Sequence, residues 1–390
     1  MQQQLAGCET RLYKNGLAEP DTAVFGTTED RIYWNCRNPA SPILEPLFSE
    51  VRTQSLLYAR PAEPYATVLS YLCHTAMDGA IRPDDCETRT VLQDLPVTAE
   101  FETGHLADAL KNRACTVIPE QGIVACGASP AQAYVNFSAA CFAGFVKFFS
   151  DTLNTSRHGR IQASREKALD RACRHLPVPA VFEGGLMRGP FENATDVHSA
   201  IIEAGREIID RRLVDACFGN ISYSLDKTLY ITTSGSFLDD LEEEVVAADL
   251  ESGTCSREKP SSELPAHMEI AASTSFRAVL HGHPLFSVIM SMDCDEQDCP
   301  NKGSCHIYCP KPREIRGIPV VTGEVGGGPH GLCHTVPAAI KRNKAAIVHG
   351  HGVFTCAARD FNNALGRMVT IEQICRKTYF EQIDARVKTS

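Results

Sequence analysis

Two His-Gly-His segments are the residues best able to carry chemistry in this sequence. They end the runs Arg277-Ala-Val-Leu-His-Gly-His-Pro284 and Ala346-Ile-Val-His-Gly-His-Gly352. Each run is apolar and bounded by Pro or Gly, which predicts a buried strand that meets a turn. Residues i and i+2 of a strand project to the same face, so His281 and His283 can converge on one point. Such imidazoles, with a distant third His and a carboxylate, suit zinc or a similar divalent ion, although a lone His in a strand is usually a satisfied core residue.

Length and composition indicate a two-domain globular protein. The chain has 390 residues, 43% of them apolar and 22% charged, which exceeds what one core usually fills. The net charge of −10, without a Lys/Arg cluster, argues against nucleic acid as a partner. Neither a membrane-spanning run nor a signal peptide is expected, so the predicted location is cytoplasmic. The seventeen cysteines mostly lie in apolar segments and are expected to be reduced thiols.

The elements that would position the histidines can be read from periodicity. Apolar residues at helical spacing predict a helix over 195–213, with Thr195 and Asp196 as caps. Strands are expected at 218–224 and 228–232, and a long helix is expected at about 360–383.

The first half of the chain repeats this order. Without a gap, residues 64–72 fall on 284–292, and residues 115–126 match 345–356 before a long helix at about 129–153. In this alignment the histidines at 281, 283 and 351 and the glutamate at 263 fall on Pro61, Glu63, Gln121 and Ile43. We therefore predict a tandem pair in which one copy has lost every ligand; the alternative is a chance similarity of two unrelated α/β domains. The expected boundaries are 1–155 for the degenerate domain, 156–194 for a linker and 195–390 for the catalytic domain.

The second half resembles the class II aldolase/adducin head family, whose best-known member type is L-fuculose-phosphate aldolase. The matching motifs, in family order, are Gly219-Asn-Ile-Ser222, Ile231-Thr-Thr-Ser-Gly235, Pro260-Ser-Ser-Glu263, His281-Gly-His283 and His351-Gly352. The resemblance implies an α/β fold: two tandem three-layer α/β/α domains, each with a mixed, mostly antiparallel central sheet.

The same resemblance implies a site. Zinc, or another divalent cation such as Mn²⁺, Fe²⁺ or Co²⁺, would be held by His281, His283 and His351, with Glu263 near it as acid/base. His349 is an alternative ligand to His351, but the following Gly352 favours His351. The family's phosphate cradle is matched by Asn220, Ser234, Gly235, Ser261 and Ser262. The two serines before Glu263 also suit a plain helix cap.

One departure concerns the proton donor. The aldolases carry a Tyr in the loop before the third histidine, and residues 321–334 contain none. His330, His334 or Glu324 are the candidate acids there. The predicted function is a metal-dependent lyase that cleaves a C–C bond of a small sugar phosphate or hydroxy-carbonyl compound through an enediolate. A dehydratase or decarboxylase, and a non-catalytic adducin-like interaction domain, are the alternatives.

A second cluster consists of thiols in a polar loop. It comprises Cys294, Cys299, Cys305 and Cys309. These thiols are candidates for a structural zinc or an iron–sulfur cluster, but their spacing fits no standard motif, and free loop thiols are the alternative.

Family members form fourfold tetramers with active sites at subunit borders. The resemblance therefore implies a homo-oligomer, either a tetramer or a dimer of tandem chains with a pseudo-fourfold ring. The other expected partner is a small-molecule substrate, phosphorylated in keeping with the cradle; neither nucleic acid nor a membrane is expected.

Overall fold

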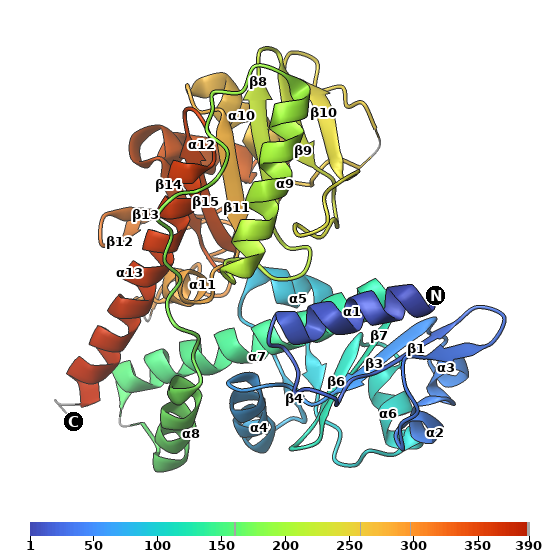
Figure 1. Ribbon diagram of the computed structural model, residues 1–390. Helices are drawn as coiled ribbons and strands as arrows, with labels where there is room; N and C mark the ends of the chain where they lie inside the picture. The colour runs from blue at the N-terminus through green and yellow to red at the C-terminus, as the bar shows by residue number, and fades with distance from the viewer. Residues whose placement is uncertain (160, 258, 297, 388–390) are drawn as a thin grey trace. The chain divides into compact units, whose positions relative to one another are not determined.

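The computed structural model describes residues 1–159, 161–257, 259–296 and 298–387, and the last residues of the expected catalytic domain, 388–390, lie outside that part. The chain divides into two compact units, Met1–Val178 and Pro179–Ala385 (Figure 1). Among the described residues, no helix is long and apolar enough to cross a membrane.

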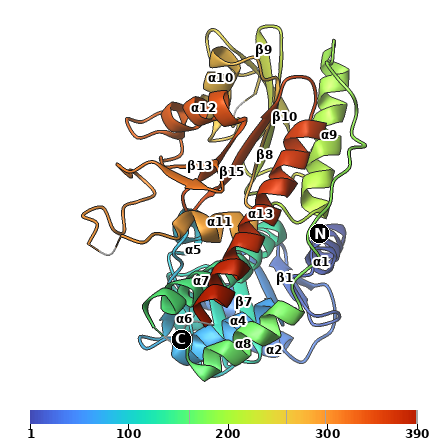
Figure 2. The ribbon, with the colours of Figure 1, turned by 90° about the vertical axis from the view of Figure 1, so that its left-hand side faces the viewer.

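The second unit is a sheet covered by helices on both faces. The strands follow the order β10-β9-β8-β11-β15-β14-β13-β12 and are antiparallel except for the parallel pair β13–β14. Figure 2 shows α10 and α12 on one side of this sheet and α9 and α13 on the other. The predicted fold class is thereby confirmed. The elements are α9 (Ala194–Asp210), β8 (Asn220–Leu225), β9 (Thr228–Thr232), β10 (Val245–Asp249), α10 (Leu264–Ser273), β11 (Ala278–Gly282), α11 (Leu285–Met292), β12 (Arg313–Ile315), β13 (Ile318–Val321), α12 (Leu332–Asn343), β14 (Ala345–Val348), β15 (Gly352–Ala357) and α13 (Asn362–Val387).

Helix α9 illustrates how the sequence forms these elements. Val197, Ile201 and Ile208 are fully buried at helical spacing on one face. The N-terminus is capped by Asn193, whose Oδ1 accepts a hydrogen bond from the Asp196 backbone N–H at 2.9 Å. The prediction of Thr195 and Asp196 as caps was therefore wrong by two to three residues, because Asn193 places its acceptor where the first free N–H groups point.

The first unit is a smaller version of the same architecture. Its main sheet has the order β2-β1-β3-β7-β6, beside a two-stranded sheet β4-β5. Within the stretch 156–194, which was expected to be a linker, residues 163–174 form helix α8, which buries Leu169 and Ala172. The elements are α1 (Gln2–Lys14), β1 (Val24–Thr28), β2 (Ile32–Trp34), α2 (Ser41–Leu44), α3 (Leu47–Glu50), β3 (Ser55–Ala59), α4 (Tyr65–Thr75), β4 (Ala80–Ile81), α5 (Cys86–Leu92), β5 (Leu95–Pro96), α6 (Thr103–Leu110), β6 (Cys115–Ile118), β7 (Gly122–Gly127), α7 (Pro130–His158) and α8 (Ala163–Arg174).

The order of the first sheet matches the central five strands of the second, β9-β8-β11-β15-β14. Because residues 115–126 match 345–356, Ala125 corresponds to Thr355. In the ladders Leu57 lies opposite Ala125 and Leu280 lies opposite Thr355, so Leu57 corresponds to Leu280. By this register His281 corresponds to Tyr58 and His283 to Arg60, so the gap-free alignment with Pro61 and Glu63 was wrong. The physical reason is a connection from β3 to α4 that is longer than the one from β11 to α11.

Candidate metal centre

Three histidines meet at the ends of neighbouring strands of the second unit. His281 lies in β11, His283 follows that strand, and His351 lies in the turn between β14 and β15. One ring nitrogen of each lies within 4.8 Å of the others, and the Nε2 atoms of His281 and His283 are 2.9 Å apart. All three side chains are buried. The structure thus brings together the three predicted imidazoles.

The donor chemistry of this cluster fits a divalent cation. His281 Nδ1 lies 3.2 Å from the Val353 carbonyl oxygen, so Nδ1–H donates there and Nε2 is left as an acceptor. Burial, reinforced by the neighbouring rings, holds the pKa values of His281 and His283 well below their usual range, which keeps both rings neutral. Buried imidazole lone pairs that face one another at this distance favour a shared cation.

Glu263 completes the cluster from the helix side. It occupies the residue before α10 and is buried. Its Oε2 lies 3.3 Å from His281 Nε2, and its Oε1 lies 3.4 Å from His351 Nε2. In the described part of the chain the Glu263 side chain does not cap α10, and the hydroxyl of Ser261 accepts from the Glu263 N–H at 3.3 Å. Glu263 therefore faces the histidines, as the resemblance implies.

A buried polar relay, absent from the sequence analysis, orients Glu263. Asn220 Nδ2 donates to Glu263 Oε2 at 2.7 Å, and Asn220 Oδ1 lies 2.6 Å from His267 Nε2. Because the amide oxygen can only accept, His267 Nε2 carries the hydrogen, and Nδ1 accepts from the Ser222 hydroxyl at 2.6 Å. Burial lowers the pKa of His267 to about 3, so this ring stays neutral. Its spacing of four residues from Glu263 on one helix face was the available signal.

Glycine at position 352 leaves room for the ligands. A Cβ there would lie 2.4 Å from the Gly282 carbonyl oxygen, 2.6 Å from His283 Cδ2 and 2.8 Å from His281 Cε1. His349 takes no part in the cluster; its Nδ1 lies 2.9 Å from Arg313 Nη1 and 2.9 Å from the Ser291 carbonyl oxygen. His351, rather than His349, therefore joins the other two rings.

The predicted phosphate loops lie side by side. Thr233 and Pro260 form a bridge, the Ser234 N–H donates to the Lys259 carbonyl at 3.0 Å, and the Ser261 N–H donates to Thr232 at 3.1 Å. Ser234, Gly235 and Ser262 are exposed, whereas Ser261 is buried. The Asn220 amide is engaged by Glu263 and His267 instead. The phosphate role of these residues stays a prediction.

The candidate acids lie apart from the cluster. His330, His334 and Glu324 are exposed, and within the described residues no hydrogen bond or ring contact joins either histidine to His281, His283 or His351. Tyr308, which precedes the loop 321–334, has its ring centroid 6.3 Å from that of His330 and is 53% exposed. Tyr308 is thus a further candidate acid.

The cysteine loop lies between α11 and β12. In the described part of the chain, the groups able to hold a metal are the three histidines and the exposed set Glu100, Glu102 and His105. No three of Cys294, Cys299, Cys305 and Cys309 meet there. The arrangement favours loop thiols over a second metal site.

The second unit is similar to a known protein family. Residues 199–379 match the family model of the Class II Aldolase and Adducin N-terminal domain, a span that contains the three histidines and Glu263. This match lies within the second unit, which is therefore the part of the chain that is similar to class II aldolases.

The relatives carry one name. The chain is 28% identical over 174 residues to an L-fuculose phosphate aldolase of Methanococcus maripaludis, which covers 44% of this chain and 90% of the relative. It is 35% identical over 86 residues to the protein of the same name from Methanococcus vannielii, covering 22% of this chain and 48% of that relative. A solved l-fuculose-1-phosphate aldolase from Thermus thermophilus aligns at 22% identity and a TM-score of 0.40 over 48% of this chain and 95% of its own.

Proposed function

We propose that this protein is a divalent-metal-dependent lyase that cleaves a C–C bond in a small phosphorylated hydroxy-carbonyl compound. The observation that carries the proposal is the convergence of three neutral, buried imidazoles beside a buried carboxylate, in a domain that is similar to class II aldolases. A divalent cation held by His281, His283 and His351, with zinc the first candidate, would act as a Lewis acid on the substrate carbonyl and favour an enediolate.

Glu263 is the acid/base of this proposal. Asn220 holds Oε2 in place, and Oε1 lies toward His351. A buried carboxylate next to the reacting carbon can accept a proton and return it without reorganising solvent. The relay through His267 and Ser222 fixes which way the Asn220 amide faces, so that the amide N–H, and not its oxygen, meets the carboxylate.

The two adjacent loops are the proposed phosphate site. The candidate donors are the hydroxyl groups of Ser234, Ser261 and Ser262 and the turn N–H groups of Gly235 and Ser262. Neutral donors of this kind bind a dianion without a permanent cation. This arrangement is the reason for preferring a phosphorylated substrate.

The acid for the leaving fragment is proposed to come from another copy of the chain. Tyr308 and His330 lie next to each other and are exposed, without contact to the histidine cluster of their own unit. A neighbouring copy could present this pair to the site, which supports a homo-oligomer with active sites at its subunit borders.

The test is an assay with product trapping. L-fuculose 1-phosphate, the compound in the relatives' names, and a panel of hydroxy-carbonyl phosphates are incubated with wild type and Glu263→Gln, before and after chelation. The proposal expects separate aldehyde and ketone fragments, lost on chelation and reduced roughly 10²- to 10⁴-fold by Glu263→Gln. A dehydrated product of unchanged carbon count would favour a dehydratase, and loss of carbon dioxide a decarboxylase. A metal-free, inactive protein would favour an adducin-like interaction domain.

A further inference from the structure

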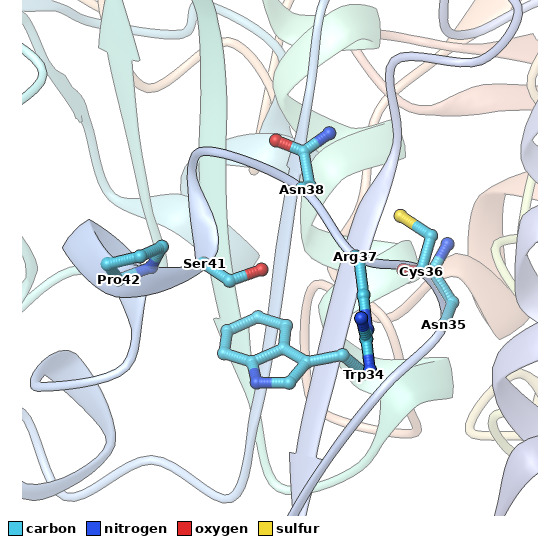
Figure 3. Close-up of a pocket in the computed structure, with 7 residues that line it drawn as sticks. All are labelled: Trp34, Asn35, Cys36, Arg37, Asn38, Ser41 and Pro42. Carbon is cyan, nitrogen blue, oxygen red and sulfur yellow. The ribbon is translucent and has the colours of Figure 1, made fainter.

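The first unit contains a pocket far along the chain from the histidine cluster. It lies between the end of β2 and the start of α2 and has a volume of about 430 Å³. Figure 3 shows the residues that line it: Trp34, Asn35, Cys36, Arg37, Asn38, Ser41 and Pro42. This volume falls within the range of small-molecule sites and exceeds what a single water or inorganic ion needs.

The aromatic wall of this pocket is fixed by the core. The indole of Trp34 lies over Gly26, where a Cβ would come within 2.6 Å of Trp34 Cζ3, and its edge packs against Phe48 with ring centroids 5.9 Å apart. The next residue, Asn35, ties the loop to β1: its Oδ1 accepts from the Phe25 N–H at 2.9 Å. The pocket therefore has a preformed apolar side.

The opposite side carries donors without acceptors. Ser41 Oγ is buried and has no hydrogen-bond partner among the described residues, and Ser41 lines the pocket together with Trp34 (Figure 3). Asn38 uses its Oδ1 to accept from the Ala40 N–H at 2.9 Å, which leaves its amide N–H groups for a ligand. Arg37 is exposed and is the one charged residue among those described as lining the pocket. Buried hydroxyl groups usually have a hydrogen-bond partner, so the Ser41 hydroxyl is a candidate position for a contact with a ligand or a water molecule.

We propose that this pocket binds a small phosphorylated compound. The phosphate would take a charge-assisted hydrogen bond from the Arg37 guanidinium and neutral ones from Ser41 and Asn38, while the carbon skeleton lies against the indole of Trp34. A guanidinium combined with neutral donors is a strong set for a phosphate dianion. On the side of the pocket formed by Cys36, burial and then the carboxylate of Glu9 in α1 raise the pKa of the thiol. Because the same carboxylate would repel a phosphate, we place the anion on the Ser41 side.

The position of the pocket in the fold supports this assignment. By sheet order, β2 and the segment before α2 correspond to β9 and the segment before α10, which carries Ser261 and Glu263. The first unit thus has a polar pocket at the position that corresponds to the segment before α10, but different residues line it. The inference stands on these donors and does not depend on the proposed lyase activity.

Fluorescence provides a direct test, because Trp34 is the single tryptophan of the chain. Wild type is titrated with glycerol 1-phosphate, inorganic phosphate and glycerate, and the titration is repeated with Arg37→Met, Ser41→Ala and the control Arg31→Met. Arg31 is also exposed and lies over the Tyr33 ring. We expect a saturable signal with glycerol 1-phosphate, about tenfold weaker binding in Arg37→Met, several-fold weaker binding in Ser41→Ala and no change in Arg31→Met.

Three outcomes would overturn the proposal: no saturable signal in wild type, equal affinity in wild type and Arg37→Met, or tighter binding of glycerate than of glycerol 1-phosphate. Ser41→Ala guards against a folding artefact. Removing a buried hydroxyl that lacks a partner should leave the melting temperature unchanged or raise it, so weaker binding in that variant reports on the pocket itself.

Discussion

The two units share a frame, by which we mean the order and register of five strands, and they differ in the side chains at the ends of these strands. At the positions of His281 and His351, the first unit has Tyr58 and Gln121. The Tyr58 hydroxyl donates to the Gln121 carbonyl at 3.2 Å, and its ring lies 4.6 Å from that of Phe101. One copy therefore closes this corner with a phenol and a single hydrogen bond, where the other gathers three imidazoles.

The relay is lost together with the ligands. In the ladders, Val24 lies opposite Tyr58 as Asn220 lies opposite His281, so the residue that holds Glu263 has an apolar counterpart. The apolar face beneath is kept: Leu56 and Val124 belong to the core of the first unit as their counterparts Val279 and Phe354 belong to that of the second. The comparison teaches that the packed face defines the frame, whereas a few polar residues at strand ends define the chemistry.

The largest effect should come from a matched pair of substitutions at one position of this frame. His283→Ala removes a proposed ligand, and we expect loss of stoichiometric metal and about a thousandfold lower activity, since a Lewis acid supplies several kcal/mol. Arg60→Ala, at the corresponding exposed position of the first unit, should leave both unchanged. Metal analysis by mass spectrometry and steady-state rates would check this, and full metal content in His283→Ala would refute the ligand assignment.

The sequence predicted well the helices and strands that have a regular apolar spacing. Apolar spacing located α9, β9 and the two long helices, and the i, i+2 rule placed His281 and His283 together. It could not locate the relay, because His267 meets Asn220 only after α10 packs beside β8, and no local pattern encodes that contact. Likewise, the register of β3 is set by its hydrogen-bonded pairing with β7 and cannot be read from the apolar residues of β3 alone.

The irregular segments were the least predictable part of the chain, for a related reason. Helix α8 is rich in charge and buries two residues, Leu169 and Ala172, so its apolar spacing is a weak signal for a helix. Cysteine spacing in a loop does not determine whether the thiols converge, since the loop path is free between them. Local pattern therefore predicts elements, whereas tertiary contacts decide caps, registers and polar networks.

His267→Phe tests whether the relay, which the first unit lacks, contributes to activity by orienting Glu263. Without the imidazole, the Asn220 amide loses the contact that fixes its orientation toward Glu263. We expect kcat to fall about 10- to 100-fold with KM and metal content little changed, as for residues that orient a catalytic group. A proportional loss of bound metal, or of folded protein by circular dichroism, would show that His267 is structural only.

Glycine provides a pair that separates stability from chemistry. Gly122 and Gly352 occupy corresponding positions at the start of β7 and β15; a Cβ on Gly122 would lie 2.5 Å from the Ala59 carbonyl oxygen, and one on Gly352 would lie 2.4 Å from that of Gly282. Either Gly→Ala change should lower the free energy of unfolding by about 1–3 kcal/mol. Only Gly352→Ala should also weaken metal binding, because it displaces His281 and His283. Equal metal affinity in the two variants, measured by competition with a chelating dye, would contradict the crowding argument.

A gradual effect is expected in the pH dependence of stability, which should differ between the two units of the metal-free protein. Burial lowers the pKa of His267 to about 3, so between pH 6.5 and that value the unfolded chain holds a proton that the folded one lacks. The second unit should therefore lose up to about 1.4 kcal/mol per pH unit for this histidine as the pH falls below 6.5.

The first unit should respond with the opposite sign over part of this range. Burial raises the pKa of Asp85 to about 6, so the folded state holds the extra proton, and its contribution to stability declines as the pH rises toward 6. Urea unfolding followed by Trp34 fluorescence reports on the first unit alone, while circular dichroism reports on both. His267→Phe should reduce the slope of the acid loss in circular dichroism by the share of this histidine, while His281, His283 and His349 continue to contribute, and it should leave the Trp34 transition unchanged. An acid loss of the same slope in that variant would mean that other groups, and not this buried ring, make the second unit sensitive to acid.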